Sequence, residues 1–353
     1  MKPLKILIEM KHGLGDCVCM LPAIRAVREK FPDAYIAMLV DGKANEEIFR
    51  HSHIKIDKYY YFSLKKYSKL HTLKIVSQLF FIGFDIGILA TMTPVEKGKK
   101  LFKLLRIKHC YGEQFDGLSF LDLEDKMHFV DRNLAVVRPL TGDTAKRQPV
   151  LFADPAEGEK FEPTIGGIRG KIIAVNIGGA DKNYYKGKYV FTRSWNKNSM
   201  HELTEKLAEL PGCHIFLLGG RLEEELIKDY EDILVRGNVF NFVNRTSIGE
   251  SIYLLSRSDV SVGVDTGMQH VADALGVSTV SIFGPTNPKT HGAYSDKAEF
   301  VQCMPKMACQ YCFEQDVYYT CPNRKCLNQI SADDVYKKVL SAIEKGMDIL
   351  SDD

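Results

Sequence analysis

The sequence has no long apolar run and no large excess of charge of one sign. Its most apolar stretch, residues 79–90, is interrupted by Asp85 and two glycines and is shorter than the ~20 residues that a membrane-spanning helix needs. The 47 Lys and Arg residues nearly balance 45 Asp and Glu residues, so the formal net charge is only +2. We therefore expect no nucleic-acid partner and at most peripheral membrane contact.

The chain also lacks the marks of an exported, disulfide-bonded protein. Residues 1–9 have neither the apolar region nor the cleavage site of a signal peptide, which predicts a cytoplasmic location. Five of the nine cysteines fall between Cys303 and Cys326, a clustering that favours thiols or a metal over a disulfide scaffold. The ordinary composition, with 45% hydrophobic and 26% charged residues, is that of a folded protein.

Short apolar strands alternate with amphipathic helices along the chain, which is typical of parallel βαβ units. In the first half the predicted strands are 5–9, 35–40, 85–90 and 109–111, and the predicted helices are 17–30, 64–81, 95–105 and 128–140. These elements would complete one doubly wound sheet.

A polar stretch with Pro and Gly, residues 141–170, interrupts this pattern before a second cycle begins. The second cycle has predicted strands at 172–176, 214–218, 239–242, 260–264 and 279–283, and predicted helices at 199–210, 223–230, 248–256 and 268–275. A capping box, Ser331-Ala-Asp-Asp334, starts a last predicted helix, 332–345, which we expect to end at Gly346.

We therefore predict an α/β fold of two Rossmann-like, doubly wound domains that face each other across a cleft. The domains are residues 1–150 and 151–330, followed by a C-terminal helix and tail, 331–353. In such folds ligands bind at the strand-to-helix turns, so the chemistry should lie there.

The first strand-to-helix turn carries Gly13 and Gly15, the start of a dinucleotide-binding fingerprint. Its third glycine is replaced by Val18, and Asp16 would repel a pyrophosphate at the helix N-terminus. An NAD-dependent oxidoreductase is therefore only an alternative. Asp16 itself has two interpretations that can hold together, a cap of the helix N-terminus or a general base.

The second domain contains a strand-turn-helix-strand-turn unit, residues 261–288. Thr266, Gly267 and Met268 would place backbone N–H groups at a helix N-terminus, which suits a phosphate. Asp265 would accept hydrogen bonds from sugar hydroxyls. His270 would reach the same ligand, although a histidine there can also be a satisfied polar residue without a role.

These motifs together resemble glycosyltransferase family 9, the ADP-heptose lipopolysaccharide heptosyltransferases with the two-domain GT-B architecture. The residues that carry the resemblance span nearly the whole chain and are Gly15-Asp16, Leu21 to Ala26, Phe31-Pro-Asp33, Asp265-Thr-Gly-Met-Gln-His270 and Phe283-Gly-Pro-Thr-Asn-Pro288. The resemblance implies inverting transfer of a heptose from ADP-heptose to a glycan hydroxyl, at the inner face of the cytoplasmic membrane, without a catalytic metal. A sugar-binding or assembly protein that has lost turnover is the alternative. The acceptor and the oligomeric state stay open.

The resemblance also implies roles for single residues. Asp16 matches the family's catalytic base, and Asp265, Thr266, Gly267 and His270 match its donor-binding turn. Arg193, before Trp195, would supply the cation that stabilises the departing diphosphate, with Lys182, Lys186 and Lys188 as alternatives. Glu224, after Gly219-Gly220, would contact the ribose, unless it only complements a helix dipole.

The cysteines near the carboxyl end form two pairs. Cys309 and Cys312 are a C-x2-C pair, Cys321 and Cys326 are a looser pair, and Cys303 is a fifth candidate. This set predicts a structural zinc or iron site with four thiolates, against reduced buried cysteines or disulfides. Because the segment 303–326 follows both donor turns in sequence, we expect it to stabilise the fold without touching the reaction.

Overall fold

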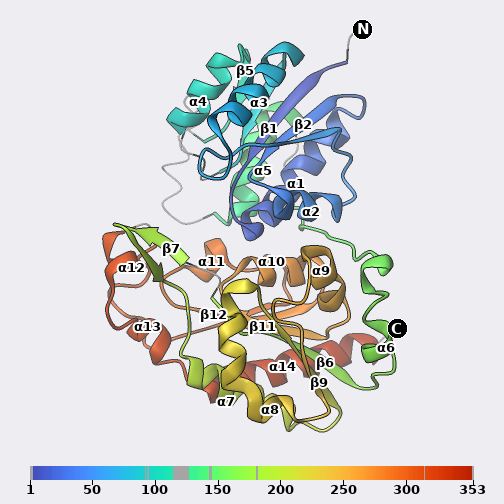
Figure 1. Ribbon diagram of the computed structural model, residues 1–353, viewed down its shortest axis with the longest axis vertical. Coiled ribbons are helices and arrows are strands. Elements are labelled where there is room, and N and C mark those ends of the chain that lie inside the picture. The colour runs from blue at the N-terminus through green and yellow to red at the C-terminus, as the bar shows by residue number, and fades with distance from the viewer. Residues whose placement is uncertain are drawn as a thin grey trace. The chain divides into compact units, whose positions relative to one another are not determined.

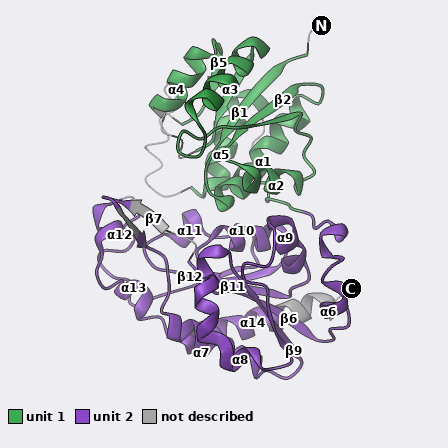
Figure 2. Ribbon diagram, in the orientation of Figure 1, with its two compact units in different colours: residues 1–151 green, residues 152–353 purple. Residues whose placement is uncertain are grey.

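The computed structural model describes residues 3–91, 93, 95–113, 127–142, 145–179, 182–313 and 315–351. The chain divides into two compact units, residues 1–151 and 152–353 (Figure 2). Each unit contains its own parallel sheet with helices around it (Figure 1).

Unit 1 is built on a five-stranded parallel sheet with the strand order β3-β2-β1-β4-β5. The strands are β1 (Lys5–Met10), β2 (Tyr35–Val40), β3 (Lys58–Tyr61), β4 (Ile86–Leu89) and β5 (His109–Tyr111). The helices are α1 (Leu14–Lys30), α2 (Lys43–Arg50), α3 (Lys69–Ile82), α4 (Val95–Leu104) and α5 (Phe129–Thr141). Ile6, Leu7 and Ile8 of the central strand are fully buried, as a strand covered by helices on both faces requires.

Unit 2 is built on a six-stranded parallel sheet with the strand order β10-β9-β6-β11-β12-β13. Its strands are β6 (Lys171–Asn176), β9 (Cys213–Leu218), β10 (Val239–Asn241), β11 (Val260–Val264), β12 (Ser278–Phe283) and β13 (Ala298–Gln302). A separate antiparallel hairpin consists of β7 (Lys182–Tyr185) and β8 (Lys188–Phe191).

The helices of unit 2 cover this sheet and its edges. They are η2 (Pro155–Gly158), α6 (Glu162–Ile165), α7 (Lys197–Ala208), η3 (Arg221–Tyr230), α8 (Glu231–Leu234), α9 (Ile248–Ser256), α10 (Gly267–Ala274), α11 (Pro288–His291), α12 (Asp316–Thr320), α13 (Lys325–Asn328) and α14 (Ala332–Ser351). Val335 and Val339 of α14 are fully buried in the same core as β11 and β12. The last helix therefore belongs to the fold of unit 2.

The prediction of two doubly wound parallel sheets is confirmed, but several local predictions were wrong. The last helix does not end at Gly346 and continues to Ser351. The segment Arg221–Tyr230 is a 3-10 helix followed by a short α-helix, not one α-helix. The capping box at the start of α14 is present, since Asp334 N donates to Ser331 Oγ and Ser331 N to the Asp334 carboxylate.

None of the helices in the described part of the chain is both long and apolar enough to cross a membrane.

Candidate active site

Asp16 lies in the first turn of α1, directly after the carboxyl end of β1. Its Oδ2 accepts a hydrogen bond of 2.9 Å from Gly13 N. The residue at the N-cap position is Gly13, and Asp16 is the third residue of the helix. The prediction that Asp16 occupies the N-cap position was therefore wrong. The carboxylate nevertheless stands at the helix N-terminus, where it would oppose the pyrophosphate of a dinucleotide.

A buried polar network, which sequence reasoning missed, lies behind this turn. Glu9, at the end of β1, is 3% exposed, accepts a hydrogen bond of 2.6 Å from Thr93 Oγ1 and pairs with Lys11 at 3.0 Å. The same Thr93 hydroxyl lies 2.8 Å from His12 Nε2, and Asn45 Nδ2 donates to the His12 carbonyl. These bonds fix the turn that carries Asp16. The available signal was a charged residue inside an otherwise apolar strand.

The β11–α10 turn of unit 2 carries an ion pair between residues far apart in sequence. Asp265 is 4% exposed, and its Oδ2 accepts a hydrogen bond of 2.9 Å from Arg193 Nη1 and one of 2.7 Å from Thr286 Oγ1. Burial opposes the charged carboxylate, but the Arg193 charge and the Thr286 hydrogen bond outweigh it and lower the pKa of Asp265. An ionised carboxylate thus holds a guanidinium at this turn.

The first residues of α10 and its N-cap have buried side-chain groups without hydrogen-bond partners among the described residues. Thr266 is the N-cap residue, and Gly267 and Met268 form the first turn. Thr266 Oγ1 and both amide atoms of Gln269 are buried and have no hydrogen-bond partner among the described residues. Because buried polar atoms are normally paired, such atoms mark a place where a ligand or water completes the bonding. His270 is half-buried, and its charge contributes to the lowered pKa of Asp265.

Arg193 is held in place by its neighbours in sequence. Thr192 is buried and donates a hydrogen bond of 2.7 Å to the Tyr318 hydroxyl, and Trp195 Nε1 donates to the Ile330 carbonyl. Of the alternative lysines, Lys186 lies over the Tyr185 ring, 4.8 Å from its centroid, at the turn of the β7–β8 hairpin. The side chains of Lys182 and Lys188 lie outside the described part of the structure.

The acidic turn after β9 is organised by Glu223 rather than by Glu224. Glu223 is 7% exposed, and its Oε2 accepts a hydrogen bond of 2.8 Å from Gly220 N. A Cβ at Gly178 would lie 2.0 Å from the Glu223 side chain, so the loop after β6 passes directly over this residue. Glu224 is exposed, and Glu223 is the acidic residue that sequence reasoning missed here.

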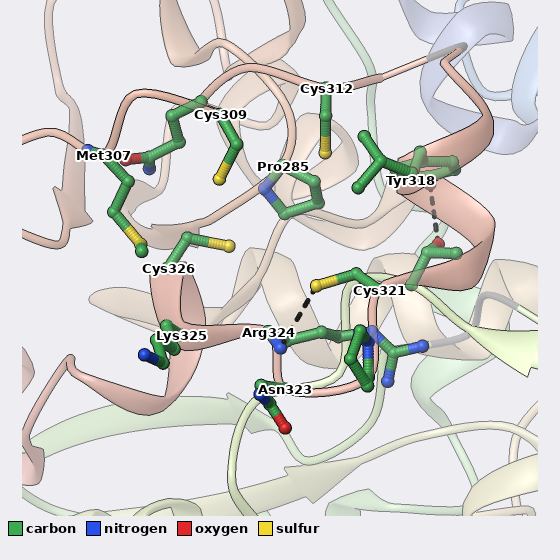
Figure 3. Close-up of a pocket in the computed structure, with 14 residues that line it drawn as sticks. Pro285, Met307, Cys309, Cys312, Tyr318, Cys321, Asn323, Arg324, Lys325 and Cys326 are labelled. Carbon is green, nitrogen blue, oxygen red and sulfur yellow. Dashed lines mark hydrogen bonds between the residues drawn. The ribbon is translucent and has the colours of Figure 1, made fainter.

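Four cysteines line one cavity of about 200 Å³ in unit 2. They are Cys309, Cys312, Cys321 and Cys326, and Figure 3 shows their sulfur atoms turned toward the same space around Pro285. Burial and the neighbouring thiols raise the pKa of Cys326 to about 12. The structure thus brings the two predicted pairs together.

The fifth candidate, Cys303, does not line this cavity and donates from its Sγ to Gln310 Oε1 at 3.3 Å. The same Gln310 side chain donates through Nε2 to the Gly284 carbonyl, and Phe313 N donates to the Pro285 carbonyl. The cysteine segment therefore packs against the turn that ends in Thr286, the partner of Asp265. The segment is thus close to a donor turn in space although it follows that turn in sequence, and its expected role in stabilising the fold without touching the reaction stays a prediction.

The comparisons with known proteins agree with this architecture. The model of glycosyltransferase family 9 (heptosyltransferase) matches residues 119–321, more than half of the chain. Lipooligosaccharide heptosyltransferase 2 of Campylobacter jejuni is 23% identical over 97% of this chain and 99% of its own. Among solved structures, the glycosyltransferase family 9 protein of Veillonella parvula superposes with a TM-score of 0.78 at 18% identity, over 97% of this chain and 98% of that one. The ADP-heptose lipopolysaccharide heptosyltransferase II of E. coli gives 0.73 at 16% identity, over 97% and 99%.

The chain has two parallel sheets with charged groups at their strand-to-helix turns. Together with these similarities, this architecture defines a glycosyltransferase of the GT-B class. The chain belongs to glycosyltransferase family 9, the heptosyltransferases. This membership replaces the dinucleotide-dependent oxidoreductase as an explanation of the first glycine turn.

Proposed function

We propose that this protein transfers a heptose from ADP-heptose to a hydroxyl group of a glycan during assembly of the lipopolysaccharide core. The observation that carries the proposal is the Arg193–Asp265 pair beside the buried Thr266 hydroxyl, which has no hydrogen-bond partner among the described residues, at the N-cap of α10. The C. jejuni relative, which is named a lipooligosaccharide heptosyltransferase, aligns over nearly its whole length and supports the same reaction.

Unit 2 would bind the nucleotide sugar. The backbone N–H groups of Thr266, Gly267 and Met268 and the guanidinium of Arg193 would contact the diphosphate, since both favour negative charge. The Asp265 carboxylate keeps Arg193 in place, and a polar ligand would complete the bonding of Thr266 Oγ1. Glu224 is exposed and would reach a ribose hydroxyl at the edge of the site.

Unit 1 would bind the acceptor. Asp16 would take the proton from the acceptor hydroxyl as its oxygen attacks the anomeric carbon from the side opposite ADP. The bond between the anomeric carbon and the diphosphate oxygen breaks, the electron pair leaves with ADP, and the anomeric configuration inverts. Negative charge then grows on the diphosphate. Arg193 and the α10 amides would stabilise this charge more strongly in the transition state than in the ground state. No step of this mechanism needs a metal ion.

Donor binding tests the proposal directly. A thermal-shift panel of ADP-heptose, ADP-glucose and UDP-glucose should show the largest stabilisation by ADP-heptose, because a ligand of the native state raises stability according to its affinity. Arg193→Ala should reduce that shift, whereas Lys197→Ala, which removes an exposed cation four residues away, should not. Equal shifts in both variants would remove Arg193 from the donor site.

We also propose that Cys309, Cys312, Cys321 and Cys326 hold a structural zinc or iron ion. The donor set suits either metal, because four thiols line one cavity and thiolates form the tetrahedral sulfur site that both metals accept. Among the described residues no three of these sulfur atoms lie within 4.8 Å of one another, so the cysteines would have to close around the ion. Arg324 N lies 3.4 Å from Cys321 Sγ and donates to it, as a backbone amide does to a metal-bound thiolate. The ion would hold the cysteine segment against the Gly284–Thr286 turn.

Elemental analysis of freshly purified protein should give about one zinc or iron per chain, and Cys309→Ser/Cys312→Ser should lose both metal and stability. Cys213→Ser is the matched control, because the Cys213 thiol is also buried but lies in β9, well before the cysteine segment in the sequence. Metal well below one per chain, with the four thiols free or paired, would contradict the site.

A further inference from the structure

A buried hydrogen bond joins the cysteine segment to the residue that precedes Arg193. Tyr318 lies in α12, between Cys312 and Cys321, and its hydroxyl accepts a hydrogen bond of 2.7 Å from Thr192 Oγ1 (Figure 3). Tyr318 is 3% exposed and Thr192 is 1% exposed, so both hydroxyl groups are shielded from bulk water. A tyrosine from a distant part of the chain thus holds the backbone directly beside Arg193.

The ring of Tyr318 is itself restrained by aromatic neighbours. It packs edge to face against Tyr319, with the ring centres 4.9 Å apart, and in the same way against Phe313 at 5.3 Å. Phe313 N donates a hydrogen bond to the Pro285 carbonyl, one residue before Thr286. The Tyr318 hydroxyl therefore has a fixed position relative to the turn that carries Thr286.

Helix α12 also contacts the β7–β8 hairpin. The ring of Tyr319 stacks on Tyr185, with the ring centres 4.7 Å apart and the planes 3° from parallel. The Tyr185 hydroxyl lies 2.8 Å from Asp316 Oδ1 and donates to it. The helix thus holds the hairpin through Tyr185 in β7 and holds the chain directly after β8 through Thr192.

These contacts matter because they reach both partners of the buried ion pair. The arginine side chain is long, so the place of the Arg193 guanidinium depends on its partner Asp265 and on where the backbone holds Arg193. Asp265 is in turn bonded to Thr286. Tyr318 connects the backbone at Thr192 with the turn at Thr286, and so it fixes the two sides of the pair relative to each other.

We propose that Tyr318 is a positioning residue of the donor site. Through Thr192 it sets the place of the Arg193 guanidinium, and it does not itself contact the nucleotide sugar. The inference rests on the proposed contact between Arg193 and the donor diphosphate. A displacement of about 1 Å in a group that acts on the reaction can cost about a hundredfold in rate, so one remote hydroxyl can matter.

Variants that break only this bond test the proposal. Tyr318→Phe keeps the ring and should lower ADP affinity by about three- to tenfold in calorimetry and kcat by about tenfold or more. Thr192→Val should give the same losses, and Thr192→Ser, which keeps a hydroxyl, should recover most of them. The double variant Tyr318→Phe/Thr192→Val should be no worse than either single variant, because the same bond is broken only once.

The Arg193→Ala background separates positioning from a general structural role. Tyr318→Phe should change ADP affinity by less than about twofold in that background, because its effect passes through the missing guanidinium. If Tyr318 only stabilised the fold, the loss of ADP affinity would be the same with and without Arg193.

Tyr230→Phe is the matched control. Tyr230 is also 3% exposed, and its hydroxyl is hydrogen-bonded to the buried Thr204. This variant loses the same kind of bond elsewhere in unit 2, so it should keep wild-type ADP affinity and kcat. Urea unfolding of both tyrosine variants shows whether the two changes cost similar stability.

The outcomes distinguish this inference from the proposed function. Wild-type ADP affinity and kcat in Tyr318→Phe, together with an impaired Arg193→Ala, would overturn the positioning role and leave the donor site in place. Equal losses from Tyr318→Phe in both backgrounds would also overturn it. Wild-type donor binding and turnover in Arg193→Ala would remove both the diphosphate contact and the inference that rests on it.

Discussion

Replacement of Arg193 by alanine tests the centre of the proposed donor site. The Asp265 carboxylate is 4% exposed and accepts hydrogen bonds from Arg193 and from the Thr286 hydroxyl. The replacement removes the first of these bonds and leaves the second. Removing one partner of a fully buried ion pair costs about 3–5 kcal/mol. Because the Arg193 side chain is 24% exposed, water reaches the vacated side, and we expect about 2–3 kcal/mol.

Kinetics should separate this structural role from a catalytic one. If Arg193 chiefly stabilises charge that develops on the diphosphate, kcat falls by about 10²–10³ in Arg193→Ala, a larger factor than the rise in the donor KM that the lost ground-state contact causes. Arg193→Lys keeps the charge and should recover part of both losses. Urea unfolding and steady-state heptose transfer measure the two effects on the same preparations.

A double variant provides the internal check. In Arg193→Ala/Asp265→Asn the buried carboxylate is also gone, so the double variant should be more stable than the sum of the single changes predicts. Lys197→Ala removes an exposed ion pair with Asp229 and should change stability by less than about 1 kcal/mol. Wild-type stability and wild-type turnover in Arg193→Ala would refute the reasoning and leave the hairpin lysines as the diphosphate partners.

Three further predictions concern single carboxylates. Asp16→Asn should lower kcat by about 10²–10⁴ without changing the donor affinity measured by calorimetry. The amide oxygen can still accept the hydrogen bond from Gly13 N but cannot act as a base. Turnover near the wild-type rate would show that Asp16 only stabilises the helix terminus. Glu223→Ala should destabilise the protein by about 1 kcal/mol in urea unfolding through loss of the bond to Gly220 N, whereas Glu224→Ala should weaken ADP binding at unchanged stability; the reverse pattern would exchange their roles. The pKa of Asp265 is lowered in the folded state, so its contribution to stability is present above the unfolded pKa of about 3.9 and is lost as pH falls through the lower folded value. Asp265→Asn should therefore make the free energy of unfolding less dependent on pH on the acid side. Identical acid profiles for the wild type and the variant would contradict the lowered pKa.

The strands of the two sheets could be predicted from the sequence where they are short, apolar and buried on both faces. The predicted strands at 35–40 and 260–264 match β2 and β11, whose residues are almost all buried. β3, with the sequence Lys-Tyr-Tyr-Tyr, was missed, because it lies at the sheet edge and has neither an apolar run nor alternation.

Turn chemistry explains two other misses. No hairpin was predicted at β7–β8, where Lys186 and Gly187 both have positive φ, as a two-residue hairpin turn requires. The prediction that α14 ends at Gly346 was wrong, because a glycine inside a helix costs only about 1 kcal/mol relative to alanine, which a helix of 20 residues tolerates.

The candidate site was predictable only in part. The motif at Asp265 identified one turn, but its bonds to Arg193 and Thr286 join residues 72 and 21 positions away, and no local pattern specifies such partners.

The central claim is inverting heptose transfer from ADP-heptose. Its most direct test is to incubate the wild-type protein with ADP-heptose and a heptose-deficient lipopolysaccharide core, and to determine the anomeric configuration of the product by NMR. The account predicts one ADP released for each heptose transferred, an inverted anomeric configuration, and loss of this product with Asp16→Asn. Retention of configuration, or faster transfer from another nucleotide sugar, would contradict it.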